Sequence, residues 1–326
     1  MAKMTMVQAI NLALRQEMEK DDRVIVLGED VGRDGGVFRV TDGLIDKFGE
    51  NRSVDTPLAE SAIVGMSIGM AVYGLRPVCE IQFSGFSYLA FHQIECHAAR
   101  LRMRSQGVCE VPMVVRAPCG GGVRALEHHS ESRETYYAHT PGLKMVIPSG
   151  PRNARALLVS AIRDPDPVIF FEPKATYRAF REEVPEEEET LPLGKSVKVQ
   201  EGKDLTIISY GAMMRPTLEA VEALKEDDGV EAEVIDLLTL SPLDHDLFSE
   251  SVKKTGRAVI VHEAPRSFGP GAEIISRIME KAFFYLEAPI ARVTGFDVHI
   301  PLFSREMAYL PGKNRIVRAA REILNA

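Results

Sequence analysis

Short runs of apolar residues alternate along the chain with stretches in which apolar residues recur every three or four positions. The short runs are typical of strands buried in a parallel sheet, and the recurring positions are typical of helices with one buried face. In the first half, residues 7–18 and 157–162 show the helical spacing. The same half contains five runs that predict strands, at residues 24–27, 76–81, 113–116, 144–147 and 168–171.

The same alternation resumes in the second half. Strands are predicted at residues 205–209, 232–237 and 258–262, and helices near 216–225 and 272–284. Strands that alternate with helices predict parallel or mostly parallel sheets covered by helices, so we expect an α/β fold with two domains.

A run of glutamates flanked by Pro185 and Pro192 separates the halves. A like-charged run with prolines is typical of a solvated linker. We therefore predict a first domain at residues 1–185, an acidic linker at 186–200 and a second domain at 201–326.

Composition and charge narrow the class of protein. The chain has 326 residues and a formal net charge of −8, so it lacks the basic surface expected of a nucleic-acid binder. No apolar run reaches membrane-spanning length, and the amino end lacks the apolar core of a signal peptide. The four cysteines show neither a Cys-x-x-Cys pair nor zinc spacing. We read them as reduced cysteines of a cytoplasmic protein.

Glu60 is the residue whose position most needs explaining. It opens residues 61–72, a stretch of small and apolar residues that predicts a buried helix. One explanation is local: Thr56 or Asp55 caps the helix, Pro57 occupies its first position, and an acid suits the helix dipole. The other explanation is that Glu60 has a chemical role.

Other candidate groups follow predicted strands. Residues 80–83 are polar and aromatic at the carboxyl end of a strand, the edge where open α/β sheets bind ligands. The glycines at 120–122 could approach a phosphate, but a flexible loop is the simpler interpretation. His128 and His129 lie in a polar loop, where either a surface or a functional role is open. Gly65 and Gly69 predict tight helix packing, within the subunit or across an interface.

Five segments in this order carry a resemblance to a known family: 55–60 (DTPLAE), 80–86 (EIQFSGF), 129–130 (HS), 139–144 (HTPGLK) and 169–174 (IFFEPK). The chain resembles, essentially end to end, the beta subunit of the thiamin-diphosphate-dependent decarboxylase component of 2-oxo acid dehydrogenase complexes. The resemblance implies a pyrimidine-binding thiamin-enzyme domain followed by a domain like the carboxyl-terminal domain of transketolase.

The resemblance also implies roles for particular residues. Glu60 matches the glutamate that hydrogen-bonds N1′ of the aminopyrimidine and so promotes proton exchange at the cofactor. Phe86 matches an aromatic residue that packs on the pyrimidine ring, and Gln82 and Leu58 are expected at the same cofactor site. His129 matches a histidine that assists proton transfers of substrate and lipoyl group.

A monovalent cation site is a further implication of the resemblance. In some family members a loop matching Ala161, Asp164 and Asp166 binds such a cation, for example K⁺. Two of these positions differ from one relative, which has cysteine and asparagine where this chain has Ala161 and Asp166.

The diphosphate half of a thiamin site is missing from the sequence. Thiamin enzymes hold diphosphate and Mg²⁺ through Gly-Asp-Gly followed by Asn-Asn, and the chain has neither. We therefore expect no Mg²⁺ ligand in this chain. We expect an alpha subunit to supply the Mg²⁺ and diphosphate ligands, in an α2β2 heterotetramer.

The expected activity is decarboxylation of a 2-oxo acid and transfer of the acyl group to a lipoyl-bearing acyltransferase component. Residues 128–130 and 169–174 look closer to branched-chain members, so a branched-chain 2-oxo acid is the expected substrate. A pyruvate or acetoin dehydrogenase beta subunit is the alternative. Two rival interpretations also stay open: a fragment of transketolase or deoxyxylulose-phosphate synthase, and a non-catalytic α/β interaction module.

Overall fold

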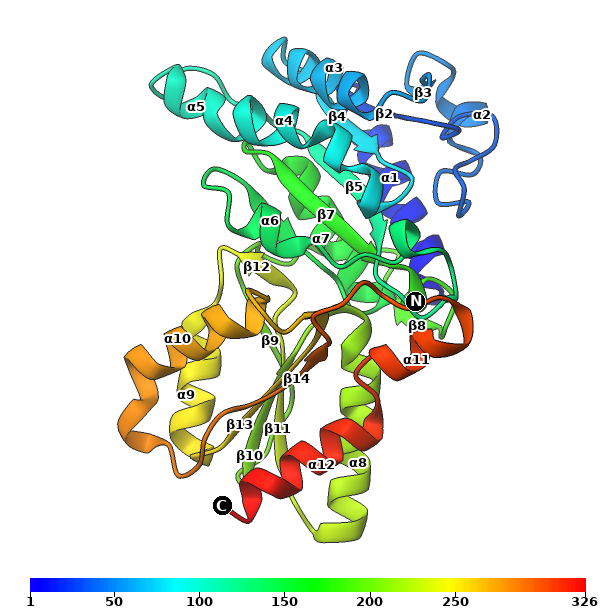
Figure 1. The fold of residues 1–326 in the computed structure, drawn as a ribbon. Helices are drawn as coiled ribbons and strands as arrows, with labels where there is room; N and C mark the ends of the chain where they lie inside the picture. The colour runs from blue at the N-terminus through cyan, green and yellow to red at the C-terminus, as the bar shows by residue number, and fades with distance from the viewer.

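The computed structural model describes residues 1–326 and builds them around two helix-covered sheets (Figure 1). The first sheet has seven strands in the order β12-β6-β7-β5-β4-β2-β3. Its strands are β2 (Val24–Gly28), β3 (Ser53–Asp55), β4 (Arg76–Glu80), β5 (Val114–Cys119), β6 (Lys144–Val146), β7 (Val168–Pro173) and β12 (Thr239–Ser241). All neighbours run parallel except β12, which is antiparallel to β6.

Helices cover both faces of this sheet. Helices α1 (Met6–Lys20) and α7 (Pro151–Arg163) pack together on one face, and α3 (Glu60–Val72) and α4 (Tyr88–Cys96) on the other. Because both faces are buried, the central strands are mostly apolar, and the charged side chains of Arg116, Glu80 and Glu172 among them pair with one another. Short elements complete the domain, namely α2 (Leu44–Phe48), α5 (Leu101–Arg104), α6 (Glu134–Ala138) and the antiparallel pair of β1 (Ala2–Met4) with β8 (Glu182–Val184).

The second sheet has five strands in the order β14-β13-β10-β11-β9. They are β9 (Val197–Gln200), β10 (Leu205–Ser209), β11 (Ala232–Asp236), β13 (Ala258–Pro265) and β14 (Ala291–Gly295). Helices α8 (Met214–Asp228) and α12 (Lys313–Leu324) cover one face, and α9 (His245–Thr255) and α10 (Pro270–Ala282) the other. The short α11 (Glu306–Tyr309) precedes α12. The predicted α/β fold with two mostly parallel sheets is confirmed.

Residues 186–200, predicted to be a solvated linker, are held by contacts with both domains. The last four of these residues form β9, an edge strand antiparallel to β11. Of the glutamates before it, 186–188 are exposed and Glu189 is half-buried. They are tied to the first domain, because Glu188 pairs with Lys20 and Arg163, and Glu189 pairs with Arg152 at 2.6 Å.

The two halves share a hydrophobic core. One cluster of 34 buried residues includes α3 and α4 of the first domain and α9 and α10 of the second. Strand β12 reaches from the second half into the first sheet. The halves are therefore fixed against each other, and the carboxyl edge of the first sheet is packed against the second domain.

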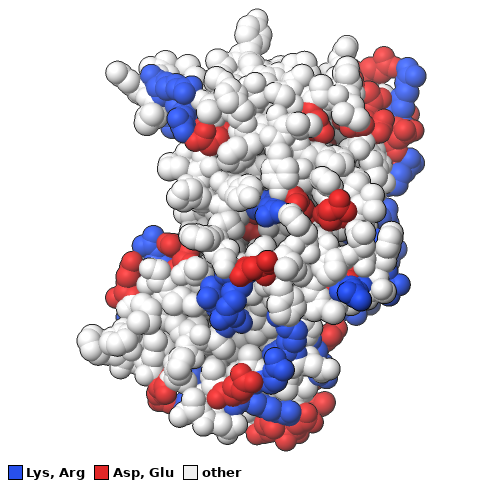
Figure 2. Space-filling model, viewed as in Figure 1, with Lys and Arg blue, Asp and Glu red and all other residues white.

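Surface charge and helix lengths complete the description. On the face drawn in Figure 2, acidic and basic side chains are interspersed, and much of the upper domain there is uncharged. No helix combines the length and apolarity needed to cross a bilayer.

Candidate active site

The candidate residues lie along one edge of the first sheet. Strands β3, β2, β4, β5 and β7 are successive neighbours and run parallel, so the segments that leave them emerge at the same edge. These segments carry, strand by strand, Glu60, then Glu29 and Asp30, then Gln82 and Phe86, then His129, and finally Lys174.

Glu60 is the first residue of α3 and its side chain lies in a buried setting, with 6% of the residue exposed. The local explanation is correct in one part, because Glu60 lies in the first turn of α3, where an acid suits the helix dipole. Its capping part was wrong: the N-cap is Ala59, no side chain caps the helix, and Pro57 lies outside it. Asp55 instead accepts hydrogen bonds from the backbone N–H groups of residues 32 and 33. No group of the chain hydrogen-bonds the Glu60 carboxylate, which leaves it free to bind something else.

A second carboxyl group, Glu29, accompanies Glu60 and was missed by sequence reasoning. Burial raises the pKa of Glu29 above its usual range, and the neighbouring carboxylates of Asp30 and Glu60 raise it further. A buried carboxyl beside other carboxylates holds its proton more tightly. The sequence could have pointed to Glu29, because this residue directly follows a strand that is apolar throughout.

The other predicted cofactor residues differ in their surroundings. Gln82 is half-buried and its Nε2 donates to Asp30 Oδ2 at 3.0 Å. Phe86, in the 3₁₀ turn Ser84–Phe86, is half-buried and packs on the large core cluster. Leu58 is 69% exposed, so the fold of this chain does not bury it.

His129 lies in an aromatic cluster with Phe83 and Phe86. The ring centroids of His129 and Phe83 are 4.3 Å apart, those of His129 and Phe86 are 5.2 Å apart, and all contacts are edge to face. The buried Nδ1 of His129 has no hydrogen-bond partner in the chain. Its neighbour His128 is exposed and pairs with Glu127 at 3.1 Å. The structure thus separates a surface histidine from one that faces the site.

The protonation of His129 is set by its surroundings. Burial holds the pKa of His129 below its usual range, and the positive charge of Lys174 lowers it further. The Lys174 ammonium is 5.7 Å from the centroid of the Phe83 ring, and only 3% of the residue is exposed. His129 is therefore neutral at pH 7 and can either accept or donate a proton.

The glycine triplet 120–122 differs from the flexible loop expected there. Side chains of Lys174, Glu263 and Glu306 hydrogen-bond its backbone groups, and two of these come from the second domain. Sequence reasoning assigned this contact to none of the three: Lys174 was noted only as part of the 169–174 segment, and Glu263 and Glu306 lie in no segment singled out there.

The loop predicted to hold a monovalent cation has its acids already paired. Lys144 Nζ lies 2.6 Å from both carboxylate oxygens of Asp164, and Arg102 Nε lies 2.5 Å from Asp166. Ala161 offers only a backbone carbonyl, which accepts from the Asp164 N–H. The structure contains no group of three or more acidic, histidine or cysteine side chains that could hold a metal ion.

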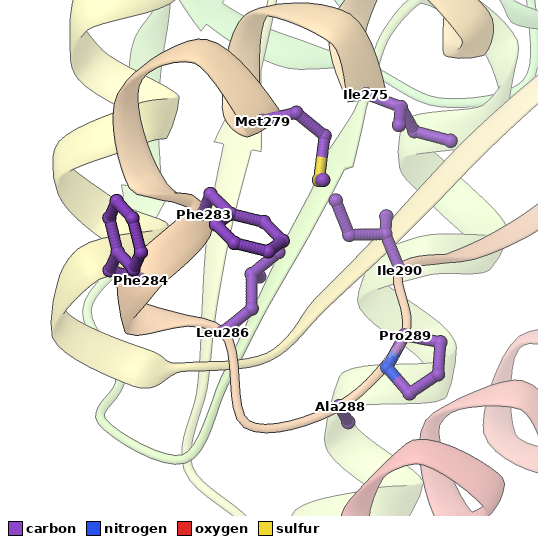
Figure 3. Close-up of a pocket in the computed structure, with 8 residues that line it drawn as sticks. All are labelled: Ile275, Met279, Phe283, Phe284, Leu286, Ala288, Pro289 and Ile290. Carbon is purple, nitrogen blue, oxygen red and sulfur yellow. The ribbon is translucent and has the colours of Figure 1, made fainter.

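One apolar pocket of about 500 Å³ lies within the second domain, away from these residues (Figure 3). Its lining contains no ionisable side chain, so it offers no acid or base chemistry. The lining residues are Ile275, Met279, Phe283, Phe284, Leu286, Ala288, Pro289 and Ile290.

Comparison with known proteins decides the family. Residues 2–179 match the transketolase pyrimidine-binding domain, and residues 194–316 match the transketolase C-terminal domain. The chain is 50% identical to a protein from Acholeplasma laidlawii named pyruvate dehydrogenase E1 component subunit beta, over 100% of this chain and 99% of the relative. Relatives of the same name from Staphylococcus epidermidis and Staphylococcus aureus are 52% and 51% identical over 99% of both chains.

The chain belongs to the family of E1 beta subunits of 2-oxo acid dehydrogenases. A solved structure titled split gene transketolase, inactive beta4 tetramer, has a TM-score of 0.81 with 22% identity and covers 99% of both chains, which supports the fold. The recognition made from five short segments is confirmed. The expected branched-chain preference is not supported, because the named relatives are of the pyruvate type, which was the alternative.

The family depends on thiamin diphosphate, and the residues present fit one end of that cofactor. The buried Glu60 carboxylate, the unpartnered His129 Nδ1 and the half-buried Phe86 ring form a polar and aromatic set at one sheet edge. No comparable set could ligate the metal that accompanies a diphosphate.

Proposed function

We propose that this E1 beta chain works with an alpha subunit to decarboxylate pyruvate and to transfer the acetyl group to a lipoyl-bearing acyltransferase component. The observation that carries the proposal is the Glu60 carboxylate, buried at the carboxyl edge of the sheet and free of any partner in the chain. A carboxylate on a largely buried residue, with no hydrogen-bond partner in the chain, is a candidate for binding a ligand.

Glu60 acts on the aminopyrimidine. With the cofactor bound, the Glu60 carboxylate would hydrogen-bond N1′ and hold or release a proton there, and Phe86 would support the heterocycle. Thiamin diphosphate, when bound, supplies the nucleophilic carbon that attacks the 2-oxo acid. Gln82 and Leu58 complete the contacts of this chain with the cofactor.

Glu29 is a second carboxyl group beside Glu60 that can take part in proton exchange. Burial raises the pKa of the Glu29 carboxyl, and the charges of Asp30 and Glu60 add to the rise. A carboxyl group with a raised pKa beside Glu60 is suited to exchange protons with it.

His129 serves the later proton transfers. As a neutral imidazole beside two phenylalanine rings, it can donate to or accept from the substrate and the lipoyl sulfur. The rings exclude water from one side, which strengthens each polar interaction made there.

The alpha subunit supplies the metal and diphosphate contacts in an α2β2 assembly. Helix α3 offers a surface for association: a Cβ atom on Gly69 would meet no atom within 4 Å in the chain, and Met66 and Tyr73 are 48% and 90% exposed. Packing inside the subunit therefore does not explain Gly69. We assign this face of α3 to a subunit interface, between two beta chains.

Pyruvate is proposed over branched-chain 2-oxo acids because relatives at 50–52% identity carry the pyruvate name. The test is kcat/KM for pyruvate and for 4-methyl-2-oxopentanoate, with this chain and its alpha partner purified together. Pyruvate should be preferred by about tenfold or more, since a pocket built for methyl accepts a branched chain poorly. A higher kcat/KM for the branched acid would restore the first expectation.

The same preparation tests the non-catalytic alternative and the cation. A non-catalytic module would bind no thiamin diphosphate even with the alpha partner.

The cation site is tested by thermal unfolding of the assembly with and without K⁺. If K⁺ raises the melting temperature, the ion binds through backbone carbonyls of the loop 161–166, because Lys144 and Arg102 already pair with Asp164 and Asp166. A cytoplasmic location stays a prediction.

A further inference from the structure

Three charged side chains form hydrogen bonds with backbone groups of the glycine triplet 120–122. Lys174 Nζ donates to the carbonyl oxygen of the first glycine at 2.5 Å. Glu263 Oε1 accepts from the N–H of the second glycine, and Glu306 Oε1 accepts from that of the third, both at 2.5 Å. Hydrogen bonds from or to charged groups are among the strongest in proteins, so this segment is firmly held.

All three charged residues are buried. Lys174, Glu263 and Glu306 are 3%, 8% and 1% exposed, and residues of these types are almost never buried without a specific partner. Lys174 begins the 3₁₀ turn Lys174–Thr176 after β7, whereas Glu263 lies on β13 and Glu306 begins α11. Two of the three therefore reach the triplet from the second domain.

The triplet is the first part of a loop, residues 120–132, that carries His129. Glu263 Oε1 also accepts from Ser132 Oγ at 2.9 Å, so one carboxylate oxygen fixes both ends of the loop. The N–H of Gly120 donates to the carbonyl of Glu131 at 3.0 Å and closes it. His129 lies inside this closed loop, three residues from Ser132.

The close fit explains why the triplet is glycine at every position. A Cβ atom on the first glycine would lie 2.6 Å from the Glu263 carboxylate, and one on the second would lie 2.6 Å from Ile300. On the third it would lie 2.9 Å from the Cβ of Ala175. The glycines therefore serve the contact with the charged residues rather than loop flexibility.

Glu263 does not reach the reacting atoms through this contact. The cavity beside it, which Ser132, Glu134 and Tyr210 also line, has a volume of about 20 Å³. Such a space admits one water molecule and no 2-oxo acid. Any effect of Glu263 on catalysis must pass through the loop.

We propose that Glu263 and Lys174 are positioning residues for His129, and that the second domain contributes to catalysis by fixing the 120–132 loop. The inference rests on the proposed function for the role of His129. It gives the second domain a role in the reaction although that domain supplies none of the candidate catalytic or cofactor-binding residues.

A double-mutant cycle in the assembled alpha–beta enzyme tests the proposal. Glu263→Ala should lower kcat for acetylation of a lipoyl domain by about 10- to 100-fold, because a misplaced catalytic group loses that much. KM for the 2-oxo acid should not change, and Glu263→Gln, which keeps an acceptor, should recover most of the rate. In a His129→Ala background, Glu263→Ala should lose less than about twofold, because the two residues act through one step. Equal losses in both backgrounds would overturn the proposal.

Hydrogen exchange of the loop gives a readout that does not depend on activity. Glu263→Ala should raise exchange in peptides covering 120–132, and Glu273→Ala should not. Glu273 is the matched control, because it lies on α10 of the same domain, 57% exposed and paired only with Arg277. If hydrogen exchange in the 120–132 loop does not change in Glu263→Ala, the proposal that Glu263 fixes this loop is refuted. An assembly that turns over no 2-oxo acid would refute the proposed function, and the exchange result would still decide whether the loop is held.

Discussion

Glu134 joins the two domains through a hydrogen bond whose strength should depend on pH. It begins α6 of the first domain, 2% exposed, and its Oε1 accepts from the Tyr210 O–H of the second domain at 2.6 Å. Burial raises the pKa of Glu134 from 4.5 to about 7, and the nearby carboxylate of Glu263 adds to the rise. The folded chain therefore binds the Glu134 proton more tightly than the unfolded chain does.

The sign and size of the effect follow from that difference. Stabilisation by the bound proton is fully present below pH 4.5 and is lost as the pH rises through about 7. A difference between 4.5 and about 7 corresponds to about 3 kcal/mol at most. Glu134→Gln keeps an acceptor for Tyr210 but cannot ionise. At pH 8 the variant should be more stable than the wild-type chain by up to about 3 kcal/mol, and at pH 4.5 the two should be nearly equal.

Urea unfolding of the isolated chain at pH 5, 6, 7 and 8 measures this gap directly. The shared core makes one cooperative transition the expected behaviour, and equal m-values in variant and wild type would support the comparison. Glu219→Gln, on the exposed surface of α8, is the matched control and should show no pH-dependent gap. A Glu134→Gln gap of the same size at pH 5 and pH 8 would refute the reasoning.

Four further outcomes are expected. Glu60→Gln should lower turnover by about 10² to 10⁴ with unchanged thermal unfolding, and near-normal turnover would remove Glu60 from the mechanism. His129→Ala should slow acetylation of a lipoyl domain more than decarboxylation followed with an artificial electron acceptor, and wild-type rates in both assays would return His129 to a surface role. Asp236→Asn should show the same pH-dependent stabilisation as Glu134→Gln, because burial raises the pKa of Asp236 to about 7, and a pH-independent effect in denaturant unfolding would contradict this. The chain without its alpha subunit should show no turnover and weak calorimetric binding of thiamin diphosphate, and stoichiometric, metal-dependent binding would reveal a diphosphate site in this chain.

The central strands could be predicted because burial on both faces makes most of their positions apolar. Residues 24–28 are the plainest case, with all five positions buried. Strand β9 escaped prediction because it is an edge strand: Val197 and Val199 are 39% and 44% exposed, and its polar residues resemble a linker. Strand β12 has three residues and forms only because the second half of the chain meets β6.

The site was predictable where residues follow a strand in the same domain. Glu60 and His129 could be selected in this way, with the family resemblance to assign their roles. Glu263 could not, because it meets the glycine triplet across 142 residues of chain and from another domain. The local capping explanation of Glu60 failed for a related reason, since Asp55 is engaged by residues 32 and 33 rather than by the helix beside it.

Strand β12 has a consequence for any attempt to divide the chain. The glutamates at 186–189 are exposed or nearly so, and a glutamate-specific protease should cut there. The carboxyl-terminal fragment would still contribute a strand to the sheet of the amino-terminal fragment and would still fill part of its core. The cut chain should run as two bands under denaturing conditions and as one particle in gel filtration. Expressed separately, the first domain would expose the edge of β6, and we expect it to aggregate.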